Sequence, residues 1–555
     1  MISRSSSRSS STATRIEASG SREKENETAR GETGDPGPTL EDIEKRGSGA
    51  GPGQRDALPS DGKERAGPAK GTAGTPDRDE DGVAVEDGVP IVRLRDPDDP
   101  LSPLNFTTAR KWLIVSIVTS GAFCITCCSS MIAFTYPGVE REFHVSAEVA
   151  TLGLSLFVLG MGIFPLLVGP LSEWYGRSPV YFIGFAVYIA FNFGVAFANN
   201  IATLLICRFL SGAFASSFLS VAGGTVADLF RPQETGAPMS AYTAGPFLGP
   251  VAGPIISGFI NQNLDWRWTW YILLIWSAVE FVALLVFVPE TYLQAILKKK
   301  AQRLRKAGRT DVRAPVEVDE RSIATVIMVS CYKPFQILAT EPMALALCTW
   351  TAILLGILYM WFTAFDIVYG AEGYGFEMQM VGLTYIPIGI GIVTGALCHP
   401  IWAGYYRRKA AQLGRRPPPE EHLRKGLWGV CIVPISLFWF AFTTYTSVHW
   451  IVSLSPSVWD SSGPSKPSSS ARLRPDLVDA FRPVAASAMA ANSAMRSSFA
   501  AAFPLFTIQM FHRLGTQYAL MLTAFLCLAM VPFPFLFFKL GHKYRRGSKF
   551  ANTED

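Results

Sequence analysis

The sequence predicts an all-α membrane protein made of two related bundles of helices. Hydrophobic residues make up 49% of its 555 residues, and the mean hydropathy is positive although the N-terminal region is almost entirely polar. The apolar residues are therefore concentrated downstream, in runs such as 112–134 and 272–288. Such runs can cross a hydrocarbon core, which needs roughly 20 helical residues. A weak duplication between the halves predicts that the two bundles are repeats.

Apolar runs predict eleven spanning helices. We place them at residues 112–135, 149–171, 179–197, 201–228, 239–261, 268–289, 343–367, 379–402, 427–448, 486–511 and 516–538. The resulting organisation is a tail at 1–95, a six-helix bundle at 96–289, a linker at 290–342, a second bundle at 343–546 and a short tail at 547–555.

The N-terminal tail is rich in Ser, Gly, Pro and charged residues and has no periodic apolar positions, which predicts disorder over residues 1–95. It has no short apolar stretch with a cleavage site, so we expect the first span to act as the insertion signal.

The distribution of Lys and Arg predicts the topology. The connections 290–342 and 403–426 are strongly basic, whereas the alternate connections are short and acidic or uncharged. Basic loops stay in the cytoplasm, so the N-terminus should lie there too. Within the first loop, residues 293–306 predict a helix with one apolar face. It could lie in the inner leaflet's interface or stand as a solvated basic helix.

The duplication appears at an offset of about 230 residues and includes a helix, its end and the basic loop that follows. Both copies run in the same direction, so the repeats are parallel. The matching glycines, in a Gly-Leu-Ser or Gly-Leu-Thr context, are Gly153, Gly160 and Gly162 in the first copy and Gly382, Gly389 and Gly391 in the second.

The connection between the second and third helices, residues 169–179, carries charges that a plain turn does not need. Its Gly176 suits a tight turn, and Glu173 and Arg177 place opposite charges at the membrane edge. From Gly169 onward it resembles the signature loop of the major facilitator superfamily, G-x-L-[SA]-[DE]-x-x-G-R-x-P. The resemblance implies an inner gate in which Arg177 pairs with Asp228 at the inner end of the fourth helix. A purely topogenic role is the alternative.

Arg208 lies well inside the apolar run of the fourth helix. A cation near the bilayer centre costs about 2.5–3.5 kcal/mol, so its side chain should face the bundle interior and find a partner. With Gly212 it resembles the family's R-x-x-x-G element, which implies a role in proton coupling. A structural anchor is the alternative.

Glycines recur every four residues in the fifth helix, at Gly245, Gly249 and Gly253, and form a smooth face for a neighbouring helix. Pro246 and Pro250 free backbone carbonyls and permit bending. The pattern resembles the antiporter motif of the drug:proton antiporter branch, which implies a hinge in an exporter.

Three further side chains are candidate transport residues. Glu280 is the only acid deep in the first half and is a candidate proton carrier, with a structural role as the alternative. Asn492 and Arg496 share one stripe of the helix at 486–511, where we expect them to line the cavity or a helix interface.

Residues 452–484 stand where a tenth helix belongs. Their seven charges would cost well over about 15 kcal/mol to bury, so this stretch is expected not to span. The next helix would then enter from the wrong side. We hypothesise that this version is a damaged gene model or a non-functional allele of a twelve-helix transporter.

These features predict proton-coupled export of small organic molecules such as drugs, toxins or polyamines by alternating access. The expected partners are the substrate, protons and the lipid bilayer, with the chain acting as a monomer in the plasma membrane. No nucleophile triad, phosphate loop or His/Cys cluster appears, so we expect no enzyme, cofactor, metal or nucleic-acid partner. The alternatives are an uncoupled facilitator or importer, and a non-transporting membrane protein.

Overall fold

The computed structural model describes residues 82–86, 89–96, 98–231, 234–318, 323–397, 420–445, 447–455 and 485–536, with a few residues between 404 and 412. The predictions for 1–81, half of 403–426, 456–484 and 537–555 therefore lie outside the described residues. In the described part, eight helices are long and apolar enough to cross a membrane, and one bent pair makes a ninth span.

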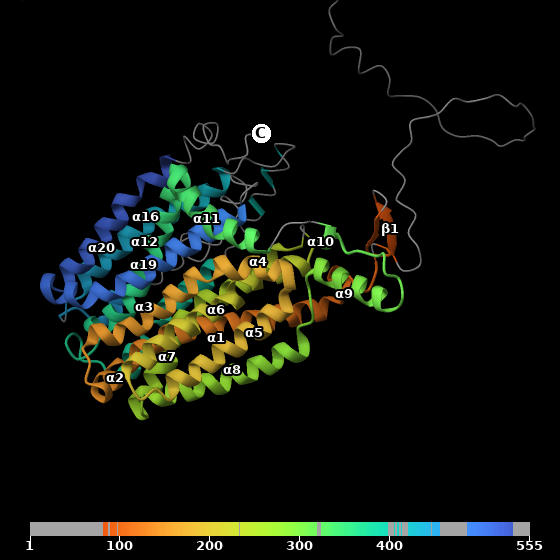
Figure 1. Cartoon of the computed structure of the whole chain (residues 1–555). Helices are drawn as coiled ribbons and strands as arrows, with labels where there is room; N and C mark the ends of the chain where they lie inside the picture. The colour runs from red at the N-terminus through yellow and green to blue at the C-terminus, as the bar shows by residue number, and fades with distance from the viewer. Residues whose placement is uncertain are drawn as a thin grey trace, which may run out of the picture. The chain divides into compact units, whose positions relative to one another are not determined.

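The first bundle follows the predicted spans to within a few residues (Figure 1). The pair α3–α4 forms one span that bends by 43° at Pro165, where the proline ring interrupts the helical hydrogen bonds. The helices of this bundle are α1 (Thr108–Met131), α2 (Tyr136–Phe143), α3 (Ala147–Ile163), α4 (Pro165–Tyr175), α5 (Arg177–Ala196), α6 (Ile201–Leu229), α7 (Gly236–Asn263) and α8 (Arg267–Phe287).

The second bundle also follows the predicted spans. Its helices are α12 (Pro342–Tyr369), α13 (Met378–Leu383), α14 (Ile386–Leu397), α16 (Glu420–Thr443), α19 (Ala485–Leu514) and α20 (Thr516–Met530). The connection between the bundles forms α9 (Leu293–Lys306), α10 (Pro315–Val318) and α11 (Ile323–Thr340). Short 3₁₀ turns, η1 (Pro103–Asn105) and η2 (Ile132–Thr135), flank α1. Below, the inner end of the molecule is the end at which α1, α7 and α12 begin, and the outer end is opposite.

Helix packing shows the parallel repeat directly. The most extensive contacts are between α1 and α7 in the first half and between α12 and α19 in the second. The pairs α5–α8 and α16–α20 also correspond. The halves meet where α3 packs against α19 and where α7 packs against α13 and α14.

The direction of α19 corrects one expectation. Ser453, before the undescribed stretch, shares a 2.9 Å hydrogen bond with the hydroxyl of Tyr369 at the outer end of α12. Asn492, after that stretch, accepts a 2.7 Å hydrogen bond from Thr351, nearer the inner end of α12. Helix α19 therefore begins at the inner end, and the expectation that it enters from the wrong side is wrong.

The N-terminal tail is not disordered as far as residue 95. Strands β1 (Val83–Glu86) and β2 (Val89–Val92) form an antiparallel hairpin in which Val83 pairs with Val92. The outer edge of β2 bonds to Arg313, through Val92 N to Arg313 O and Arg313 N to Pro90 O, both 2.9 Å. This short run becomes ordered because a segment far along the chain supplies its second edge.

The same hairpin corrects the expectation for 293–306. Residues Leu297 and Ala301 of α9 are buried against Val83 and Val92, with Leu293 and Leu304 packed beside them. The apolar face of α9 is thus covered by protein, so this face does not enter the lipid interface, which was one of the two alternatives given for this helix.

The glycine face of α7 is confirmed as a site of close approach, and the neighbour is α1. A Cβ at Gly249 would lie 2.9 Å from the backbone nitrogen of Cys127, and one at Gly245 would lie 2.8 Å from Thr119 O. A Cβ at Gly253 would lie 2.8 Å from Cys127 O. Backbone atoms cannot retreat as a flexible side chain can, so only glycine fits at these positions.

We predict that Gly249→Ala destabilises the protein by about 1–3 kcal/mol, because the added methyl overpacks the α1–α7 contact. The thermal unfolding midpoint of the purified protein in detergent should fall by several degrees. Gly236→Ala is the control, since a Cβ there meets no atom within 4 Å. Equal midpoints for the two variants would contradict this packing argument.

Candidate functional site

The inner end of the first bundle holds the expected ion pair. The Nε of Arg177 donates to Oδ2 of Asp228 at 3.1 Å, and its Nη1 donates to the Ser172 hydroxyl at 2.8 Å. The guanidinium also lies 4.8 Å from the ring centre of Tyr292. Its other side rests against Gly224, where a Cβ would come within 2.8 Å of it. Helices α4, α5 and α6 are thus joined through one side chain.

Glu290, just after α8, fixes the turn that presents Arg177. Its carboxylate accepts hydrogen bonds from the backbone nitrogens of Arg177 and Ser178 at 2.8 and 3.2 Å, and thereby caps the start of α5. It also accepts from the nitrogens of Thr291 and Tyr292 at 3.1 and 3.0 Å. Sequence reasoning did not place Glu290 in the gate, and the available signal was an acid directly after the sixth span.

The other predicted gate residues differ in their contacts. Gly176 has φ +99°, and a Cβ there would collide with the Glu290 carboxylate, so the predicted need for glycine at the turn is confirmed. A Cβ at Gly169 would meet nothing within 4 Å. Glu173 is exposed and forms no ion pair with the residues that the structure describes.

Arg208 is completely buried on α6 and is held without a carboxylate among the described residues. Its Nε donates to Gly153 O at 3.1 Å, and its Nη1 and Nη2 donate to Cys128 O at 3.3 Å. The guanidinium carbon lies 4.3 Å from the Phe157 ring centre and 4.9 Å from that of Trp270. The expectation that it faces the bundle interior is confirmed, with carbonyls and aromatic faces as its partners.

Polar side chains on one face of α1 connect the surroundings of Arg208 to Glu280. Cys128 contacts Nη1 of Arg208 at 3.3 Å. One turn earlier, Cys124 contacts Ser277 of α8 at 3.6 Å. One further turn earlier, the Ser120 hydroxyl donates to Oε2 of Glu280 at 3.0 Å. Glu280 is 6% exposed, and its Oε1 has no hydrogen-bond partner in the described part of the chain.

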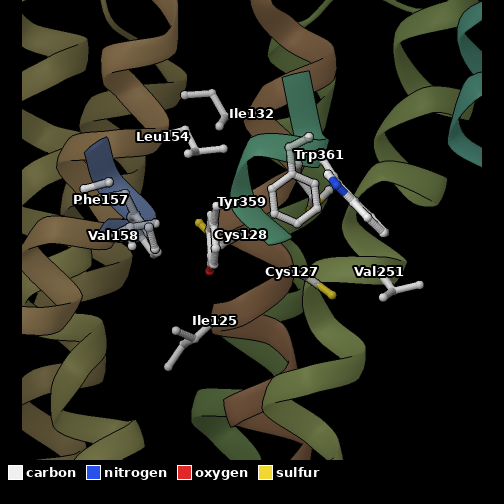
Figure 2. Close-up of a cluster of buried hydrophobic side chains, with 14 of the residues drawn as sticks. Ile125, Cys127, Cys128, Ile132, Leu154, Phe157, Val158, Val251, Tyr359 and Trp361 are labelled. Atoms are coloured by element: carbon white, nitrogen blue, oxygen red, sulfur yellow. The ribbon is translucent and has the colours of Figure 1, made fainter. Parts of the chain in front are cut away.

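The two halves share a buried polar contact that sequence reasoning missed. The hydroxyls of Ser129 on α1 and Tyr359 on α12 lie 3.1 Å apart, and both residues are buried. Figure 2 shows Tyr359 among apolar side chains that include Ile125 and Val158. Ser and Tyr are common in apolar helices, so only the packing of the halves singles them out.

The two predicted residues of α19, Asn492 and Arg496, have different surroundings. Asn492 accepts the hydrogen bond from Thr351 and so connects α19 to α12 inside the second half. Arg496, one turn further along α19, is half-buried. The next residue, Ser497, packs directly on Gly162 of α3 in the first half.

The outer ends of the halves are in direct backbone contact. Met378 N donates to the Gln262 side chain at 3.1 Å. A Cβ at Gly258 would lie 2.8 Å from Met378 O, and one at Gly382 would lie 2.8 Å from Pro254 O. A cavity of about 360 Å³ lies beside this contact, lined by residues of η2, α2, α7, the connection between α7 and α8, and α13. Helices α7 and α13 therefore leave no room between them for a side chain.

These observations define a class. The protein has two helical bundles in parallel repeat, with the Arg177–Asp228 ion pair at one end and the Ser129–Tyr359 contact between the halves at mid-depth. This arrangement is that of a multi-pass membrane transporter. Among the described residues, no three His, Cys, Asp or Glu gather as a metal site would require. The sequence model of the Major Facilitator Superfamily matches residues 118–463. The chain belongs to this superfamily and is a transporter rather than an enzyme.

Relatives and solved structures agree with this assignment. The chain is 42% identical over 472 residues to the efflux pump atB of Aspergillus terreus, covering 84% of this chain and 90% of the relative. It is 38% identical over 465 residues to the multidrug transporter mdrA of Aspergillus fumigatus, covering 82% and 75%. The xylose transporter XylE of E. coli matches in fold with a TM-score of 0.54 at 15% identity, covering 77% of this chain and 99% of XylE.

We predict that Glu290→Gln destabilises the first bundle by about 1–3 kcal/mol, because a neutral amide is a weaker acceptor for four backbone N–H groups. Thermal unfolding in detergent measures this loss. Glu234→Gln, at an exposed position in the next inner loop, is the matched control and should leave the midpoint unchanged. A Glu290→Gln midpoint within error of the wild type would contradict the capping role.

Proposed function

We propose that this transporter exports small organic molecules in exchange for protons by alternating access. The observation that carries the proposal is the arrangement of contacts between and within the halves. The outer ends touch through α7 and α13, and at mid-depth Ser129 and Tyr359 share a hydrogen bond, beside the packing of α3 on α19. Among the described residues, the hydrogen bonds named between the halves are this one and that of Met378 with Gln262, so rocking of the halves would break few polar interactions. The names of the relatives, an efflux pump and a multidrug transporter, support the export direction.

In this proposal, the N-terminus and the α9–α11 connection lie in the cytoplasm, and the protein acts as a monomer in the plasma membrane. The many Lys and Arg residues of the α9–α11 connection support that orientation. The Arg177–Asp228 pair then forms part of the inner gate. The α7 glycines let α1 and α7 move as one body while α7 carries its outer end against α13.

Arg208 and Glu280 are the proposed coupling residues. Proton uptake by Glu280 removes a negative charge from an apolar setting, where the charged form is costly. Ser120, Cys124 and Cys128 lie on one face of α1, where Ser120 contacts Glu280 and Cys128 contacts Arg208. A change in the charge of Glu280 therefore acts on the same face of α1 that binds Arg208. The state of Glu280 can thereby alter the packing of α1, which also carries Ser129.

We expect the protein in inside-out vesicles to accumulate organic dyes such as ethidium or rhodamine when the vesicle lumen is acidified. Uptake should fall to the background level when a protonophore collapses the gradient. Dye flux that does not depend on the proton gradient would indicate a facilitator. If correctly inserted protein transports none of the tested dyes, the result would favour a non-transporting protein.

Replacing Glu280 with Gln should lower gradient-driven uptake by tenfold or more, because the amide cannot exchange a proton. Dye exchange without a gradient should persist, which separates lost coupling from lost folding. Asp265→Asn, an exposed position just before α8, is the control. Full gradient-driven uptake by Glu280→Gln would remove this residue from the coupling mechanism.

A further inference from the structure

Helix α9 is strongly cationic and its charges fall into two groups. It contains six Lys or Arg residues and no acid. Three of them have partners nearby. Lys298 lies 5.4 Å from the Trp174 ring centre, and Lys300 donates to Arg93 O at 3.5 Å. Arg305 donates twice to Glu317, at 2.7 and 2.8 Å, and these bonds hold the pKa of that carboxyl below its ordinary value.

The remaining three cations form the cationic stripe, defined as Lys299, Arg303 and Lys306. All three are exposed, and none forms an ion pair with a residue that the structure describes. They follow one another at intervals of four and three residues, so they share one face of α9. Repulsion between them is unrelieved by the described part of the chain.

Contacts on α9 show which way the stripe faces. Ala295 touches the gate loop, defined as residues 169–179, where a Cβ added at Gly176 would lie 3.0 Å from the Cβ of Ala295. Lys299 follows Ala295 by one turn and therefore lies on the same side of the helix. The hairpin packs on Leu297 and Ala301, on another side. The stripe thus faces the inner ends of the spans, and the hairpin does not.

The depth at which α9 lies, at the end of a membrane span, supports contact between this helix and the lipid headgroups. The end of α4, on which α9 rests, carries Trp174 and Tyr175, and Tyr175 is 54% exposed. Aromatic residues at the end of a span mark the depth of the lipid headgroups. Because the hairpin covers the apolar face of α9, we expect this helix to contact the bilayer through its charged side chains.

We infer that Lys299, Arg303 and Lys306 bind the headgroups of anionic phospholipids in the inner leaflet. Each Lys or Arg near an anionic surface strengthens attachment by about fivefold at low ionic strength. The site relies on the proposed topology but is independent of what the protein transports. It would hold the gate loop at a fixed depth in the membrane.

The test measures retention of phosphatidylserine by the purified full-length protein, using native mass spectrometry after release from nanodiscs that contain equal amounts of phosphatidylserine and phosphatidylcholine. The triple variant K299Q/R303Q/K306Q should retain phosphatidylserine at least about tenfold more weakly than the wild type. The charge-keeping variant K299R/R303K/K306R is the matched control and should retain it normally. Raising the salt concentration should weaken wild-type retention and leave the triple variant unchanged.

The proposal is overturned if the triple variant, with a wild-type unfolding midpoint, retains phosphatidylserine as strongly as the wild type. It is also overturned if the wild type shows no preference for phosphatidylserine over phosphatidylcholine, as when an acidic segment of the chain itself occupies the stripe. Dye transport measured on the same variants keeps this result separate from the export proposal.

Discussion

A guanidinium inside an apolar bundle is the constraint around which the first half is arranged. Removing that charge from water is costly unless every donor finds an acceptor. Arg208 finds its acceptors at Cys128 O on α1 and Gly153 O on α3, and its guanidinium also contacts aromatic rings of α3 and α8. With α6, which carries it, four spans therefore contact one side chain, and a shift of α1 or α3 leaves a buried donor without its acceptor.

The two arginines of the first half solve the same problem in different ways. Arg177, at the membrane edge, is paired with a carboxylate that can release it when water enters. Arg208, away from water, is bound by carbonyls that cannot take up a proton. The first arrangement suits an interaction that opens and closes, and the second suits one that persists.

Sequence periodicity predicts the spans well because lipid demands long apolar helices, and their length is visible in one segment at a time. The glycine face of α7 was predicted for a similar reason, since residue type and spacing carry the signal. The Arg177–Asp228 pair was expected because the resemblance of the loop at 169–179 to the family's signature loop implies it. The hairpin, the capping role of Glu290 and the Ser129–Tyr359 contact were not predicted. Each needs a partner at least a hundred residues away, and the residue types involved are ordinary at their positions.

The pairing of β2 with Arg313 also fixes when the hairpin can complete its sheet during synthesis of the chain. The hairpin residues leave the ribosome before any span, but the edge that completes their sheet follows only after α8 and α9 have been made. All helices of the first bundle have therefore been synthesised before the hairpin can pair with Arg313. The hairpin can therefore pair with Arg313 only after the first half has been synthesised, when translation of the second half begins.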